Sequence, residues 1–235
     1  MTSQQQPSPR VVSVNVGRAR TVGAGRTAQV SAIDKRPVAA IEVRDPGDLL
    51  TGVGSGVEGD EIWDRAHHGG SRQAVYVVAR EQLEHWQREL GRDLDSGTFG
   101  ENLTTQGIDV DGAVVGTTWR VGEEAELEVC GPRTPCATFA AHLGEPGWVR
   151  RFTEHGHPGT YCSVRRPGRV RAGDGVWAES VPDHGVTVRT VFAAHSGDLS
   201  AAHQVLDARC LPPEEHAFLA ERVARRENAS ARVRP

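Results

Sequence analysis

The stretch Ala74-Val75-Tyr76-Val77-Val78 is the clearest structural signal in this chain of 235 residues. It is short and apolar throughout, which is typical of a β-strand that is buried on both faces. The segment Arg80–Leu90 follows directly, and its apolar residues fall on one helical face before Gly91, a common helix stop. The sequence therefore predicts a buried strand that leads into an amphipathic helix.

Further strand candidates lie on both sides of this run and are separated by glycine-rich turns. They are residues 11–16, 29–33 and 38–43 before it, and 113–121, 125–130, 160–164 and 169–178 after it. Short strands at close intervals indicate a mainly β protein, either a barrel or a sandwich, with short helical insertions. A second helix is predicted at residues 145–154, where Trp148 and Phe152 are four positions apart. We expect the helices to cap a barrel.

The sequence changes character after Pro182. Thr187 and Asp198 can each cap a short amphipathic helix, and Pro212-Pro213-Glu214-Glu215 is typical of the start of a third helix. We expect a disordered N-terminus (1–10), a barrel domain (11–181), a three-helix module (185–226) and a disordered tail (227–235). The abrupt change at Pro182 also predicts that the barrel folds without the module.

The bulk composition limits the classes of protein to consider. The chain has 37% hydrophobic and 25% charged residues, as soluble globular proteins do, and its net charge is −4. No apolar run approaches the roughly 20 residues that a membrane span needs. The polar segment Met1–Arg10 lacks the apolar core of a secretory signal, so we expect a cytoplasmic protein without a membrane partner.

Nucleic acid is a poor default partner because the charge balance is acidic. The C-terminal helices could be interpreted as a helix-turn-helix module. That interpretation is weak, because the second helix is acidic at its start and holds Arg209 as its only arginine.

The segment Gly131-Pro132-Arg133-Thr134-Pro135-Cys136 is the one most indicative of chemistry. Its two prolines oppose both a helix and a strand ladder, so we expect a rigid loop that presents Cys136. The guanidinium of Arg133 and a helix that begins at Ala137 would both lower the pKa of the thiol. On the residues alone, a reactive thiolate at Cys136 and a plain buried thiol are equally supported.

The other cysteines carry no such signal. Cys130, Cys162 and Cys210 lie in strand or helix-linker contexts, where a cysteine acts as a small buried hydrophobic residue. The spacing of the four cysteines matches neither a zinc motif nor an iron–sulfur motif.

Two further segments could bind a polar ligand. His67-His68-Gly69-Gly70 combines imidazoles with a flexible backbone whose amides can approach an anion, although it could equally be a plain turn. In Phe99-Gly100-Glu101-Asn102, the side chains of Glu101 and Asn102 could bind a ligand edge, but stabilisation of the turn is the better interpretation. A Cys–His hydrolase built on Cys136 also stays open, without an identifiable third group.

Taken together, these segments resemble the MOSC family, named after the C-terminal domain of molybdenum cofactor sulfurase. The segments that carry the resemblance are, in order, 33–38, 56–60, 67–70 with 73–76, 99–104, 132–136 and 173–174. Each is weak alone, but six in register are specific, and they span residues 11–178. The three predicted C-terminal helices resemble the module that marks the YiiM-like branch. One departure is Ser71-Arg72, where the family commonly has Pro-Asp.

The resemblance implies a MOSC-type β-barrel that binds the molybdenum cofactor, with Cys136 as the metal ligand. It also implies reduction of N-hydroxylated compounds, such as N-hydroxylated bases and amidoximes. His67 and His68 would contact cofactor or substrate, or pass a proton. The implied cofactor-binding residues are Lys35, Gly69, Gly70, Arg133, Glu101 and Asn102. Pyridoxal phosphate is not expected, because Lys35 is the only lysine that could hold it.

The chain shows no internal route for electrons, since it has neither an iron–sulfur motif nor a dinucleotide fingerprint. We therefore expect an external flavoprotein reductase as electron donor. The alternative function is a non-catalytic carrier of persulfide sulfur or of the cofactor. The oligomeric state is open, with a homodimer as one option.

Overall fold

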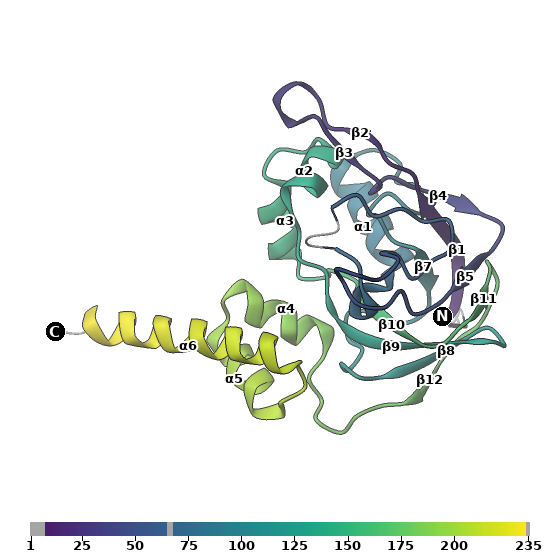
Figure 1. The fold of residues 1–235 in the computed structure, drawn as a ribbon. Helices are drawn as coiled ribbons and strands as arrows, with labels where there is room; N and C mark the ends of the chain where they lie inside the picture. Colours follow the sequence, from purple (N-terminus) through teal and green to yellow (C-terminus); the bar gives the residue numbers. More distant parts are fainter. Residues whose placement is uncertain (1–7, 65–67, 234–235) are drawn as a thin grey trace, which may run out of the picture.

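A computed structural model describes residues 8–64 and 68–233, and side chains as far as residue 229 (Figure 1). The main sheet has eight strands in the order β12-β8-β9-β10-β6-β7-β1-β4. Their bounds are β1 (Arg10–Gly17), β4 (Lys35–Val38), β6 (Val75–Ala79), β7 (Leu103–Gln106), β8 (Thr118–Val121), β9 (Ala125–Pro132), β10 (Thr160–Arg166) and β12 (Val176–Ser180). All neighbours are antiparallel except β6 and β7, which are parallel.

Two small sheets and several helices complete the fold. β2 (Arg20–Val22) pairs with β3 (Gln29–Ser31), and β5 (Ile41–Val43) pairs with β11 (Gly168–Val170). The helices are α1 (Arg80–Leu90), α2 (Ala137–Leu143), α3 (Trp148–His155), α4 (Val188–Ser196), α5 (Leu199–Ala208) and α6 (Pro213–Val233), with short 3-10 turns η1 (Gly25–Thr27) and η2 (Ser71–Gln73). No helix of the described residues is long and apolar enough to cross a membrane.

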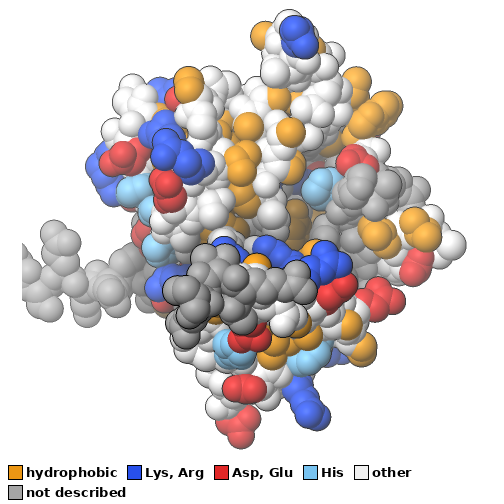
Figure 2. Space-filling model, turned by 90° about the vertical axis from the view of Figure 1, so that its left-hand side faces the viewer, with side chains coloured by type: hydrophobic (Ala, Val, Ile, Leu, Met, Phe, Trp, Pro, Cys, Tyr) orange, Lys and Arg blue, Asp and Glu red, His pale blue; other side chains and the backbone are white. Residues whose placement is uncertain are grey.

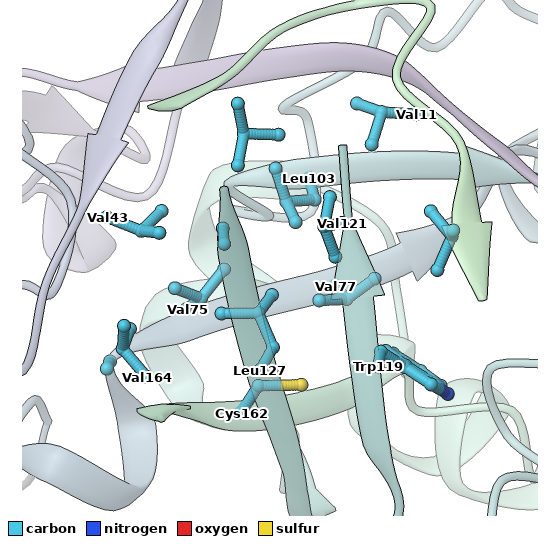
Figure 3. Packing of buried hydrophobic residues seen from close by; sticks show 14 of the residues in the cluster. Val11, Val43, Val75, Val77, Leu103, Trp119, Val121, Leu127, Cys162 and Val164 are labelled. Carbon is cyan, nitrogen blue, oxygen red and sulfur yellow. The ribbon is translucent and has the colours of Figure 1, made fainter. Parts of the chain in front are cut away.

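The predicted central strand is confirmed as β6, which lies between β10 and β7 and is buried along its whole length. Val75 and Val77 point into the main core with Leu103, Leu127 and residues of six further strands (Figure 3). Tyr76 and Val78 point to the opposite face and join the helices there. A strand that packs on both faces needs apolar residues at every position, which explains the unbroken run.

The sheet curves into a barrel whose ladder is not a complete ring. The first residues of β1 meet the turn before β12: Val11 N–H donates to the Asp174 carbonyl at 2.8 Å, and Gly173 N–H donates to the Val11 carbonyl at 2.9 Å. Val176 N–H donates to the Pro9 carbonyl at 3.1 Å. These bonds form a short seam in place of a full strand pair, so the expected barrel is present but not closed by a continuous ladder.

Helices α1, α2 and α3 cover the face of the sheet to which Tyr76 points (Figure 1). Their shared core is aromatic, with Phe139 and Phe152 ring centroids 5.2 Å apart and Phe99 and Phe139 also 5.2 Å apart. The predicted helix and stop are confirmed, since α1 ends at Gly91 in the left-handed conformation. This aromatic layer supports the loop that carries Arg133 and Cys136.

The two predicted caps of the C-terminal helices are confirmed. The Thr187 side chain accepts a hydrogen bond from Thr190 N–H, and the Asp198 side chain accepts one from Ala201 N–H. The predicted disorder beyond Arg226 is wrong, because α6 continues to Val233. Residues 227–233 contain no glycine or proline, so nothing in the backbone stops the helix there. Residues 1–7 of the expected disordered N-terminus lie outside the described residues.

The three-helix module is joined closely to the barrel. Val188 of α4 is fully buried in the main core, and Phe192 of the same helix belongs to the aromatic layer. Val188 N–H also donates to the Ala113 carbonyl at 2.9 Å. Removal of α4 would therefore leave cavities in both cores, which argues against the expectation that the barrel folds without the module.

Candidate functional site

A cavity of about 310 Å³ opens between the β2–β3 hairpin, the segment 55–69 and the start of α2. Figure 2 shows the hollowed face below the tip of this hairpin, with hydrophobic side chains gathered along it. The described residues that line it come from segments far apart in the sequence: 29–35, 55–69, β6, the turn 99–102 and the loop that ends at Cys136. The cavity therefore gathers most of the segments that the sequence indicated.

Cys136 lies at the N-cap of α2 and is half-buried at the cavity wall. Burial raises the pKa of its thiol, but a hydrogen bond from His68 and the charge of Arg133 outweigh burial and lower the pKa to about 6. The thiol is therefore mostly thiolate at neutral pH. The opposite holds for Cys130, Cys162 and Cys210, whose pKa values are raised by burial.

The loop before Cys136 differs in one respect from its prediction. The prolines were expected to exclude a ladder, but β9 extends to Pro132, which faces Thr160 of β10. Beyond Val129 the strand has only β10 as a neighbour, and a proline is tolerated at such an edge because its missing N–H can face away from the ladder. Arg133 and Cys136 thus follow directly from a sheet strand, which fixes their positions.

Arg133 is a buried cation at the cavity, with 5% of its surface exposed. Its guanidinium donates to the Phe99 carbonyl at 2.7 Å and lies 3.9 Å from the centre of the Phe139 ring. Among the described residues, no carboxylate lies within ion-pair distance of it. Burial opposes its charge, yet the neighbouring Tyr76, Tyr161 and Cys136 raise its pKa, so it stays a cation.

Tyr76 and Tyr161 also line the cavity, and the sequence interpretation did not single them out as site residues. Their ring centroids are 5.0 Å apart, and the Arg133 guanidinium lies 5.4 Å from the centre of the Tyr76 ring. The hydroxyl of Tyr76 donates to the Pro158 carbonyl at 2.6 Å. Burial raises the pKa of each hydroxyl, so both remain neutral. The available sequence signal for a site residue was that Tyr76 interrupts an otherwise aliphatic strand.

Lys35 lines the cavity but does not face it as a free cation. Its ammonium is paired with the buried carboxylate of Asp60. The same carboxylate accepts hydrogen bonds from the Ser55 hydroxyl at 2.8 Å, the Asn102 amide at 3.0 Å and Gly17 N–H at 2.7 Å. Asp60, which in the sequence belongs only to the family segment 56–60, is therefore the centre of a buried polar network at the cavity floor.

The adjacent residues Glu101 and Asn102 have different surroundings. Glu101 is fully buried, does not line the cavity, and accepts hydrogen bonds from Gly97 N–H at 2.6 Å and Phe99 N–H at 3.0 Å. Burial raises the pKa of Glu101. Its place is that of the turn stabiliser that the sequence favoured. Asn102 lines the cavity and belongs to the Asp60 network.

Of the histidine–glycine segment, His68 and Gly69 line the cavity, Gly70 does not, and His67 lies outside the described residues. Gly69 has φ +100°, and a Cβ there would lie 2.8 Å from the Gly54 carbonyl oxygen, so this position requires glycine. Arg72, in the turn that follows, donates to the Cys130 carbonyl at 2.9 Å and pairs with Glu215 of α6 at 3.5 Å.

Comparisons with known proteins find relatives of this chain. The family model described as MOSC domain matches residues 64–177, which include His68, Arg133 and Cys136. The uncharacterized protein YflK of Bacillus subtilis is 31% identical over 204 residues, which are 86% of this chain and 88% of that protein. Protein YiiM of Escherichia coli is 31% identical over 140 residues, or 58% of this chain and 62% of YiiM.

One further relative and one solved structure are informative. A protein named Reductase from Gibberella moniliformis is 29% identical over 123 residues, or 51% of this chain and 22% of that longer protein. The crystal structure of YiiM from Geobacillus stearothermophilus superposes with a TM-score of 0.69 at 21% identity and covers 92% of this chain and 99% of that chain. At this identity the structural match shows a shared fold.

Proposed function

Because the chain belongs to the MOSC-domain family, we propose that it is an oxidoreductase that holds a molybdenum cofactor in this cavity through Cys136. The observation that carries the proposal is the Cys136 thiol, whose pKa is lowered to about 6 at the cavity wall. The thiolate is the form of cysteine that ligates metals, and sulfur is a suitable ligand for a soft metal centre.

The other residues of the cavity fit the remaining groups of such a cofactor, a pterin ring and a phosphate. Arg133 is a buried cation beside Cys136, with no carboxylate partner among the described residues, so it could pair with an anionic group of the cofactor such as its phosphate. Lys35 is less suited to this role, because Asp60 already neutralises it. The Asn102 amide is already bonded to Asp60, Asn15 and Tyr76, so it shapes the cavity floor, and a cavity volume of about 310 Å³ suits a bound cofactor.

The bound cofactor would supply the two-electron chemistry. The chain would bind and orient it, and His68 would hold a proton beside the reacting atoms, since it hydrogen-bonds Cys136 and lines the cavity. The floor network of Lys35, Asp60, Ser55 and Asn102 would fix the cavity shape and leave the thiolate as its reactive group.

The reaction class that we propose is reduction of an N-hydroxylated compound, such as an N-hydroxylated base or an amidoxime. The N–O bond breaks, two electrons and two protons are taken up, and the oxygen leaves as water. The fungal relative named Reductase supports a reductive reaction. The electrons would come from an external flavoprotein reductase, because the sequence lacks a dinucleotide fingerprint.

Metal analysis of protein made in a host that synthesises the cofactor tests this proposal. We expect equal molybdenum contents in the wild-type protein and in Cys210→Ser, since Cys210 does not line the cavity, and none in Cys136→Ser. Full molybdenum in Cys136→Ser would rule out the ligand assignment. Metal-loaded protein should reduce an amidoxime with a reduced viologen but not with NADH alone.

The low pKa of Cys136 also supports a second candidate function, a carrier of persulfide sulfur or of the cofactor. A thiolate at neutral pH is a nucleophile that can take up sulfane sulfur. Sulfane sulfur on Cys136 without molybdenum would favour the persulfide carrier. Molybdenum without turnover of any N-hydroxylated substrate would favour the cofactor carrier.

A further inference from the structure

The cavity has two chemically distinct parts that differ in depth. Its floor is polar and buried, with Lys35 7%, Asn102 3% and Arg133 5% exposed. Its mouth is open and carries two exposed apolar side chains, Trp63 (62% exposed) and Val30 (40% exposed), beside the exposed acidic residues Glu61 and Asp64. The roles proposed above for the floor and for Cys136 leave the mouth without a function.

The residues just before Trp63 are anchored, whereas the Trp63 side chain is open to solvent. Asp60 accepts a hydrogen bond from Gly17 N–H at 2.7 Å, and Glu61 N–H donates to the Gly17 carbonyl at 3.1 Å. The Glu61 carboxylate also accepts from Ala19 N–H at 2.7 Å. Residues 60 and 61 are thus fastened to the end of β1, and Trp63 follows two positions later and lines the cavity.

An exposed tryptophan close to an anchored segment at a cavity mouth is a stacking surface. Its flat apolar ring gains most from contact with another flat ring, and little of its side-chain freedom is lost on binding. Val30 occupies the middle of β3, where it pairs with Thr21 of β2, so it presents a second apolar surface on a strand of the hairpin.

We propose that Trp63, assisted by Val30, determines substrate specificity by stacking on a planar aromatic ring, while the N-hydroxyl group reaches toward Cys136 and His68. This inference rests on the proposed reductase function and deepens it, because it names aromatic N-hydroxylated compounds as preferred over aliphatic ones. Trp63 would touch the ring of the substrate and not the bond that breaks.

Trp177 provides a matched control in the same chain. It is 48% exposed on β12, it does not line the cavity, and the Arg120 guanidinium lies 4.8 Å from the centre of its ring. Trp86, Trp119 and Trp148 are buried, so Trp63 and Trp177 are the exposed tryptophans. Substitution of either side chain should leave the core intact.

The kinetic test compares benzamidoxime with acetamidoxime, which share the reacting group and differ in the ring. With a reduced viologen as donor, each loses its N–O oxygen as water and becomes the amidine. We expect Trp63→Leu to raise KM for benzamidoxime about three- to tenfold and to leave its kcat little changed. For acetamidoxime, both KM and kcat should be little changed. Trp63→Phe should restore most of the loss, and Trp177→Leu should change neither substrate. An equal effect of Trp63→Leu on both substrates would overturn the inference.

A binding test separates this inference from the proposed function. Benzamidine and acetamidine carry the same charge, so each is titrated into the protein while tryptophan fluorescence is recorded. We expect benzamidine, but not acetamidine, to quench the tryptophan fluorescence. This quenching should be retained in Trp177→Phe and lost in Trp63→Phe. Quenching of this kind without any turnover would support the stacking site and count against the reductase. No quenching in the wild-type protein would overturn the stacking site, whatever the activity.

Discussion

Cys136 and Cys162 are identical side chains in opposite surroundings. Cys162 lies on β10, fully buried in the main core, and burial raises the pKa of its thiol well above the usual value. Cys136 lies between His68 and Arg133, and the pKa of its thiol falls to about 6 in spite of partial burial. The reactivity of a thiol in this protein is therefore determined by which donors and charges face it, and burial alone predicts the wrong sign for Cys136.

The largest expected difference between the two thiols is in their alkylation rate. At pH 7 we expect iodoacetamide to modify Cys136 at least about a hundredfold faster than Cys162, which reacts only when the core opens. Peptide mapping by mass spectrometry over time measures both rates in one sample. Cys210, which is half-buried and has a raised pKa, should react at an intermediate rate. Equal rates at Cys136 and Cys210 would contradict a depressed pKa at Cys136.

A smaller contrast concerns stability. We expect Cys162→Ser to lower the free energy of unfolding by about 1–3 kcal/mol, because it buries a hydroxyl in an apolar core. Cys136→Ser should cost little at pH 5 and more at pH 8. The pKa of Cys136 falls from its ordinary value of 9.0 to about 6 in the folded chain, so the thiolate stabilises the fold. This contribution is complete above pH 9, is still partly present at pH 8, and is lost as the pH falls through about 6. Urea denaturation of both variants at each pH checks this, and a pH-independent cost of Cys136→Ser would refute it.

The smallest expected effect comes from removing one donor to Cys136. His68→Ala should raise the pKa of the thiol, because the hydrogen bond from His68 favours the thiolate. A rise of about one unit would lower the alkylation rate at pH 6 about fivefold and leave the rate at pH 9 nearly unchanged. The pH profile of alkylation measures this shift. His142→Ala serves as the control, because His142 does not line the cavity and its ring is hydrogen-bonded to the Thr98 carbonyl. An unshifted profile in His68→Ala would remove His68 from the site.

Much of the fold could be predicted from local signals. The unbroken apolar run of β6, the stop at Gly91 and the caps Thr187 and Asp198 each follow from residues within one element. The burial of Val188 in the barrel core did not follow, because an apolar residue on a short helix does not show which core it joins. The length of α6 was underestimated, since its charged last turns resemble a disordered tail.

The roles of Cys136 and Arg133 could be predicted, because the residues that determine them lie in one short segment. Roles that depend on a partner far away in the sequence could not be predicted. Lys35 was expected to bind the cofactor, but Asp60 reaches it from another loop and neutralises it. Tyr161 and Trp63 became visible as cavity residues only when the chain was folded, because a single aromatic residue in a sequence does not indicate the surface it faces.

The seam of the barrel has a consequence for how the chain folds as it is synthesised. Val11 belongs to the first strand, but the backbone groups that complete its edge, on Gly173 and Asp174, emerge from the ribosome only after nearly the whole barrel has been made. Until then, the N-terminal strand presents an unpaired edge beside an apolar core. A surface of this kind makes a nascent chain prone to aggregation. Completion of this barrel is a late, non-local event, so its slowest folding step should depend on the few residues around Asp174.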